Sequence, residues 1–188
     1  MAVKRATAIA TIDCVLITMK PHKSEDEIVF DTSNQLGVEP SIETEEAVKL
    51  IIKGALRAQK PEVSTLTGHT LTLTDNVFTP EVVKLLQGGT IKTASEDGKI
   101  TGYEPPVSGS DEKGEVFDLN AYSAIYDAAG LITGYEKIVY PNCQGKPVAF
   151  GAEDGVFRTN SYTIISAPSK GQAPYSIEYV DELPIVAG

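Results

Sequence analysis

Residues 62–91 read EVSTLTGHTLTLTDNVFTPEVVKLLQGGTI, and this stretch predicts a strand, a turn and one short helix. Over residues 70–74 threonine alternates with leucine, so Leu71 and Leu73 share one face of the strand and the threonines share the other. An Asp-Asn pair then breaks the strand. The rest of the chain is expected to fold around this unit.

The helix is predicted over about residues 79–87. Thr79 suits the N-cap, Pro80 suits the first helical position, and a Gly-Gly pair ends the helix. At about two and a half turns the helix is marginal alone, so its apolar side must pack on a sheet. That side consists of Val82, Val83, Leu85 and Leu86.

Length and composition favour a single, mainly β domain spanning residues 1–188. Hydrophobic residues make up 41% of the chain and charged residues 22%, which is ordinary for a folded protein. The 16 Gly, 11 Pro and absent Trp favour strands joined by turns. Only Cys14 and Cys143 are present, and their spacing predicts two free thiols in a reducing cytoplasm.

The net charge is −10, from 16 basic and 26 acidic residues. This balance argues against a surface that grips phosphate backbones, because such affinity comes from clustered Lys and Arg. An acidic protein can still contact DNA if its task is to avoid sticking to it. No apolar run is long enough to span a membrane, so no membrane partner is expected.

Further strands separated by turn residues predict an antiparallel β-sandwich or partly closed barrel with extended loops or arms. The predicted strands are residues 8–19, 27–32, 116–126, 131–140, 147–151, 156–167 and 175–179. A mobile acidic loop is expected near residues 94–118. GKITGYE at 98–104 recurs as GLITGYE at 130–136, which predicts two similar strands entered from turns.

Residues 40–60 fit two periodicities, and the pattern alone leaves both open. Gly54 would weaken a helix but would suit a turn between strands. As a helix, Thr44 caps a face of Ala47, Val48, Ile51, Ile52, Ala55 and Leu56. As a strand, Ile42, Val48, Leu50 and Ile52 oppose Glu43, Glu45, Lys49 and Lys53.

No group of residues has the pattern of a catalytic, metal or cofactor site, so we expect no enzyme activity. His22 and His69 are interpreted as surface or turn residues. Neighbouring acids are interpreted as solvated faces rather than acid pairs or a cation site. These acids are Glu25-Asp26-Glu27, Glu45-Glu46, Asp111-Glu112 and Asp181-Glu182.

Three blocks resemble bacteriophage major tail tube proteins, the tail protein family of phages of Gram-positive bacteria. Residues 71–89, LTLTDNVFTPEVVKLLQGG, are similar to the strand and helix at the core of that family. Residues 38–61 resemble its glutamate-rich strand region, and residues 171–184 resemble its C-terminal strand. Together the blocks cover just under a third of the chain.

The resemblance implies a structural virion protein, made in the host bacterial cytoplasm, that assembles into stacked hexameric rings. The hollow tail tube so formed passes genomic DNA during ejection, and its other partners are tail proteins such as the tape measure and the tail terminator. The resemblance also implies strands at 40–60 that line the lumen, with Glu43, Glu45, Lys49 and Lys53 as candidates. An acidic wall would repel the DNA backbone.

Two other classes of function remain open from the sequence. A β-sandwich binding module, such as a carbohydrate-binding or adhesion domain, would present an exposed aromatic platform. A hydrolase using paired carboxylates would need a placed general base.

Overall fold

The computed structural model describes residues 9–30, 32–94, 98–151, 154–155 and 157–186. Within these residues the protein is mainly β, with one short helix, and every strand pair is antiparallel. The strands are β1 (Thr11–Pro21), β2 (Ile28–Phe30), β3 (Ser33–Glu45), β4 (Val48–Ile52), β5 (Ala55–Lys60), β6 (Val63–Asp75), β7 (Thr90–Thr93), β8 (Ile100–Glu104), β9 (Phe117–Tyr126), β10 (Ile132–Gly145), β11 (Asn160–Ser166) and β12 (Ser176–Val180). The helix is α1 (Pro80–Gln87).

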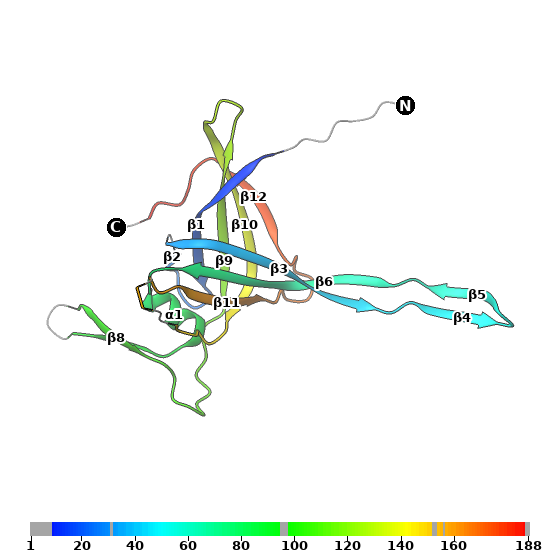
Figure 1. Ribbon diagram of the computed structural model, residues 1–188, viewed down its shortest axis with the longest axis horizontal. Helices are drawn as coiled ribbons and strands as arrows, with labels where there is room; N and C mark the ends of the chain where they lie inside the picture. Colours follow the sequence, from blue (N-terminus) through cyan, green and yellow to red (C-terminus); the bar gives the residue numbers. More distant parts are fainter. Residues whose placement is uncertain (1–8, 31, 95–97, 152–153, 156, 187–188) are drawn as a thin grey trace.

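The main sheet has the order β2-β1-β9-β10-β11-β6-β3, and β12 also pairs with β10. Figure 1 shows β1, β9, β10 and β12 running across the direction of β3, β6 and β11, so the sheet folds into two crossed layers. The path stays open between β2 and β3. The fold is therefore the sandwich with one flanking helix that the sequence predicted, and it is not a closed barrel.

Strand β10 joins the two layers. Its residues 135–139 pair with β12, and its residues 143–145 pair with β11. Between these segments the register against β9 shifts, and Asn142 has a positive φ of 50°. A bulge at this point bends the strand, which lets one strand serve both layers.

The core lies between the layers and the helix. Leu71 and Leu73 of β6 are fully buried, as the Thr-Leu alternation predicts, and Tyr162 meets Phe30 edge to face at 5.7 Å. Thr79 precedes the helix with extended backbone, and its carbonyl accepts the Val83 N–H at 3.2 Å, but its side chain makes no cap hydrogen bond. The helix packs through Val82, Val83, Leu85 and Leu86, all buried.

Two glycines allow other segments to touch the helix end. A Cβ on Gly114 would lie 2.2 Å from the Leu86 carbonyl oxygen, and one on Gly145 would lie 2.5 Å from the Leu86 Cα. Nearby, the Glu115 N–H donates to the Leu85 carbonyl at 2.9 Å. The predicted loop at 94–118 thus contains β8 and a segment held against the helix, while its residues 95–97 lie outside the described part.

Most of the predicted strands are confirmed, with shifted ends. Ala8, Asp31 and Val156, at the limits of three predicted strands, lie outside the described residues. The strand predicted at 147–151 is wrong: only Ala149 forms a bridge, to Ser161. The Val148 N–H donates to the Gln87 side chain at 2.8 Å instead of to a ladder, so helix packing replaces strand pairing here.

Residues 40–60 form strands, and the helical interpretation is wrong. Lys53 and Gly54 both have positive φ, 51° and 76°, and Ile52 pairs with Ala55 across them. This is the two-residue type I′ turn that suits a hairpin. The two similar segments, 98–104 and 130–136, are strands entered from turns, as predicted. Gly98 and Gly130 have positive φ, and strands β8 and β10 follow them.

Candidate assembly surface

A hairpin extends from the body of the molecule. β3 and β6 pair from Ser33 and Asp75 out to Glu45 and Val63, and β4 and β5 continue the ribbon to the turn at Lys53. We call residues 48–60 the arm. Figure 1 shows the arm pointing away from both layers, and every residue of β4 and β5 is exposed.

The arm is apolar on both faces. Strand pairing places Leu50 with Ala58 on one face, while Ile51 and Leu56 face each other on the opposite side. Val48 is 65% exposed, Ile51 61% and Leu56 56%. A two-stranded ribbon is marginally stable alone, and a contiguous exposed apolar surface marks an interaction site. The aliphatic side chains of the arm therefore lie on a ribbon with no core beneath it.

Charge is separated along the hairpin. The arm carries four cations and no acid, and the neighbouring hairpin residues 39–47 and 61–63 carry five acids and no cation. One ion pair joins the two regions, between Lys60 Nζ and Glu45 Oε2 at 2.5 Å, with both side chains more than half exposed. The cations are Lys49, Lys53, Arg57 and Lys60, and the acids are Glu39, Glu43, Glu45, Glu46 and Glu62.

The four residues proposed for a tube lumen lie along this hairpin and do not form a cluster. Glu43 and Glu45 are exposed on β3, opposite Thr65 and Val63 of β6. Lys49 lies on β4, and Lys53 is in the turn, so it does not continue the strand face that the alternation predicted. At about 3.3 Å per residue, Glu43 and Lys53 are about 30 Å apart along the ribbon.

Sequence reasoning missed Arg57 and Lys60, although the absence of any acid from 48–60 could have identified them. The register of β4 and β5 shifts between Leu50 and Ile51, which leaves Arg57 as an extra residue in β5. A bulge of this kind re-aims a side chain.

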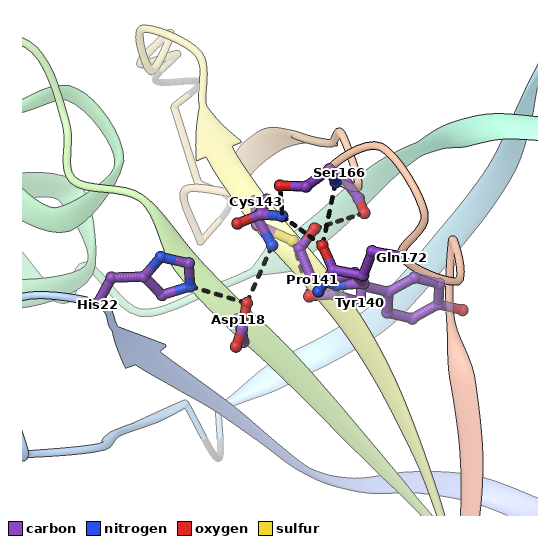
Figure 2. A network of polar contacts seen from close by, with 9 residues as sticks. His22, Asp118, Tyr140, Pro141, Cys143, Ser166 and Gln172 are labelled. Atoms are coloured by element: carbon purple, nitrogen blue, oxygen red, sulfur yellow. Dashed lines mark hydrogen bonds and ion pairs between the residues drawn. The ribbon is translucent and has the colours of Figure 1, made fainter.

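A polar network lies where β10 bends, as Figure 2 shows. Asp118 Oδ1 accepts the Asn142 N–H at 2.9 Å and lies 3.0 Å from His22 Nε2. The Ser166 hydroxyl donates to the Pro141 carbonyl at 2.9 Å. Cys143 is buried beside them as a free thiol, and burial raises its pKa to about 12, which keeps it protonated. These contacts hold the bend in place.

His69 is not the surface or turn residue that the sequence predicted. It lies within β6 at 6% exposure, with its ring edge to face against Tyr140 at 5.2 Å and Tyr175 at 5.4 Å. Among the described residues, its Nδ1 has no hydrogen-bond partner. Burial lowers the His69 pKa, so the ring is neutral near pH 7.

In two of the groups of neighbouring acids, one carboxylate accepts hydrogen bonds from other parts of the protein. Glu27 accepts hydrogen bonds from the Thr18 hydroxyl and from the Asn120 amide, the latter at 2.8 Å, and Glu112 accepts the Gly89 N–H at 2.9 Å. Across the described part of the chain, no group of three or more His, Cys, Asp or Glu could hold a metal ion. The same residues include no helix long and apolar enough to cross a membrane.

Phe78 and Phe150 are the candidates for an aromatic binding platform, and both rings lie beside Arg158. Its guanidinium carbon lies 5.2 Å from the ring centroids of both Phe78 and Phe150, which meet edge to face at 5.6 Å. Both rings therefore already make a cation–π contact with Arg158 of the same chain.

The sequence matches no protein-family model and no curated protein. Among solved structures, the sheath-tube complex of an extracellular contractile injection system, PVC, in the extended state aligns at 12% identity and a TM-score of 0.42, over 90% of this chain and 92% of that one. The six-fold symmetrised baseplate of the anti-feeding prophage aligns at 8% identity and a TM-score of 0.30, over 96% and 95%. Likenesses this low assign no function to this chain.

Proposed function

We propose that this protein is a structural subunit that self-assembles through its arm. The observation that carries the proposal is the arm, whose aliphatic side chains are exposed on both faces and take no part in the hydrophobic core of the body. Burying an aliphatic side chain contributes roughly 1.5–3 kcal/mol, so covering Val48, Leu50, Ile51 and Leu56 would strongly favour association. A neighbouring copy is the partner that is always available at the same concentration.

The assembly we propose is the tail tube of a phage-like particle, built from stacked hexameric rings. This form rests on the sequence resemblance of residues 71–89 and 38–61 to tail tube proteins. The exposed edges of β3 and β12 are compatible with it, since closing a ring of copies can pair strand edges that would otherwise promote disordered aggregation. The protein would act in the virion tail, beside proteins such as the tape measure and tail terminator, without enzyme activity or a cofactor.

Glu43 and Glu45 support passage of DNA in this proposal. Both are exposed on β3, and the chain as a whole carries a charge of −10. A wall with this charge would repel phosphates and keep DNA moving. Lys49 and Lys53, further along the hairpin, would then lie nearer to the contact with the next copy.

Deletion of residues 48–60 tests the arm directly. The deletion joins Ala47 to Pro61 and leaves a loop of four residues between the paired Glu45 and Val63, a length that hairpins accept. We expect the wild type to form rings or tubes in electron micrographs and the deletion variant to sediment as a monomer with an unchanged body.

Val107→Asp is the matched control, because Val107 is 79% exposed but lies outside the arm. This variant should assemble like the wild type. A wild type that stays monomeric at high concentration would overturn the proposal, and so would a deletion variant that assembles normally.

A further inference from the structure

A pocket of about 330 Å³ lies on the body beside the helix, between the end of β1 and β7. Its apolar lining includes Ile28, Leu85 and Ile91, none of which is fully exposed. Its volume is within the range of about 300–1,000 Å³ that is typical of binding pockets. None of the residues that line this pocket belongs to the arm.

The charged residues of the pocket are mainly acidic. Asp26, Glu81 and Glu115 line it together with one cation, Lys84. Asp26 and Glu81 are exposed, so they can meet an incoming partner in solvent. The pocket thus combines an apolar interior with an excess of negative charge.

The end of the arm has the complementary composition. Ile51, Ile52 and Leu56 are exposed next to the turn, and Lys53 and Arg57 are the cations closest to them. Figure 1 shows the arm leaving the body on the side away from α1, so in this conformation the arm does not reach the pocket of its own chain.

We propose that the arm of one copy docks into the pocket of a second copy. Aliphatic side chains at the end of the arm cover the apolar lining, and Lys53 and Arg57 face Asp26, Glu81 and Glu115. The inference rests on the proposed self-assembly through the arm and names the surface that receives it. Opposite charges set the orientation, and apolar burial supplies most of the affinity.

The contact is head to tail, since each copy offers one arm and one pocket on different sides. Such a heterologous contact repeats from copy to copy, and it produces a closed ring or an open stack according to the rotation between copies. A symmetric dimer would use the same patch twice and would stop there.

Charge exchange tests the pairing. We expect Lys53→Glu with Arg57→Glu to raise the concentration needed for assembly roughly tenfold or more, because like charges then face each other. Asp26→Lys with Glu115→Lys should have a similar effect. All four changes in one chain should restore assembly to within roughly threefold of the wild type, because the pairs are again opposite.

Two measurements keep this test decisive. Thermal melting of each variant shows that the body is folded, and Glu25→Lys is the matched control, since Glu25 neighbours Asp26 in the chain but does not line the pocket. In addition, with the partly exposed Cys14 replaced by Ser in every variant, Lys53→Cys and Asp26→Cys in one chain should cross-link between copies with a short bismaleimide. The same chain with only one of the two introduced cysteines should not.

The outcomes separate the two proposals. If the wild type assembles and the deletion of 48–60 abolishes assembly, but the four changes do not rescue and the cysteines do not cross-link, then the arm docks elsewhere, on another surface or another tail protein. That result overturns the pocket and leaves self-assembly intact. If the wild type never assembles, both proposals fall.

Discussion

At the scale of single residues, His69 shows how packing changes the chemistry of a side chain. A histidine between a glycine and threonines looks like a turn residue, yet it lies inside the body between Tyr140 and Tyr175. The residues that cover His69 come from distant parts of the chain, and of these Tyr140 is buried while Tyr175 is 42% exposed. The consequence is a neutral imidazole whose protonation opposes folding.

This predicts a pH dependence of stability. The folded pKa of His69 is below its ordinary value of about 6.5. As the pH falls below about 6.5, the unfolded chain binds a proton that the folded chain does not, so the free energy of unfolding decreases. Above that pH the stabilisation is fully present.

His69→Phe keeps an aromatic ring and removes the titration. Urea unfolding at pH 7.5 and pH 5.5 should show a smaller loss of stability in this variant than in the wild type. An identical pH slope in wild type and His69→Phe would show that the ring is accessible to protons in the fold.

Leu85 provides a second residue-scale prediction. The side chain is 4% exposed and belongs to the core cluster, so Leu85→Ala should lower the free energy of unfolding by roughly 2–5 kcal/mol. Chemical denaturation measures this change. Lys84→Ala, at an exposed neighbouring position, should cost less than about 1 kcal/mol. Equal effects of the two changes would mean that the helix does not pack through this face.

At the scale of elements, the helix owes its position to contacts outside its own sequence. Its amphipathic pattern shows which side packs, but the surrounding glycines determine how closely β10 and the segment before β9 approach. Gly114 and Gly145 come from different parts of the chain, and both meet the backbone of Leu86. Neither has a φ that requires glycine, so the requirement is one of space.

Gly145→Ala should therefore destabilise the protein by roughly 1–3 kcal/mol, because its new methyl group would overlap the helix end. Gly102→Ala in β8 is the control: no atom lies within 4 Å of its added Cβ, so its effect should be small. Thermal unfolding of both variants measures the difference. If Gly145→Ala and Gly102→Ala unfold at the same temperature, β10 does not approach the helix end as closely as described.

At the scale of the whole molecule, stability is divided between the body and the arm. The body holds the buried residues of both layers and the helix, whereas β4 and β5 are fully exposed, pair with each other and contact β3 through the Lys60–Glu45 ion pair. Segments with few buried contacts open easily, and their amides exchange fast with solvent. The arm should be the part of the molecule that gains most from assembly.

Hydrogen exchange followed by mass spectrometry measures how much protection the arm gains on assembly. In the monomer, amides of residues 48–60 should exchange within seconds to minutes, and those of residues 71–75 should be protected. In the assembled form, protection should appear over 48–60 and change little over 71–75. Unchanged exchange of the arm on assembly would contradict its role as the contact between copies.

The sequence by itself determined the strand, turn and helix of residues 62–91, because alternation, a proline and glycines act within a few residues of each other. It also determined the four buried positions of the helix and the acidic charge. It left residues 40–60 undecided, since one apolar pattern satisfied both periods, and it suggested four lumen candidates without their spread along a hairpin.

The tertiary structure alone decided which of the apolar faces are covered. Periodicity reports the face on which a side chain lies, but covering that face depends on segments distant in the chain. For this reason Leu71 is buried while Leu50 is exposed, His69 is enclosed by Tyr140 and Tyr175, and Val148 bonds to the helix while its neighbour Ala149 forms no more than a single bridge to β11. The arm is the clearest case, because its strand pattern is local but its exposure is a property of the whole fold.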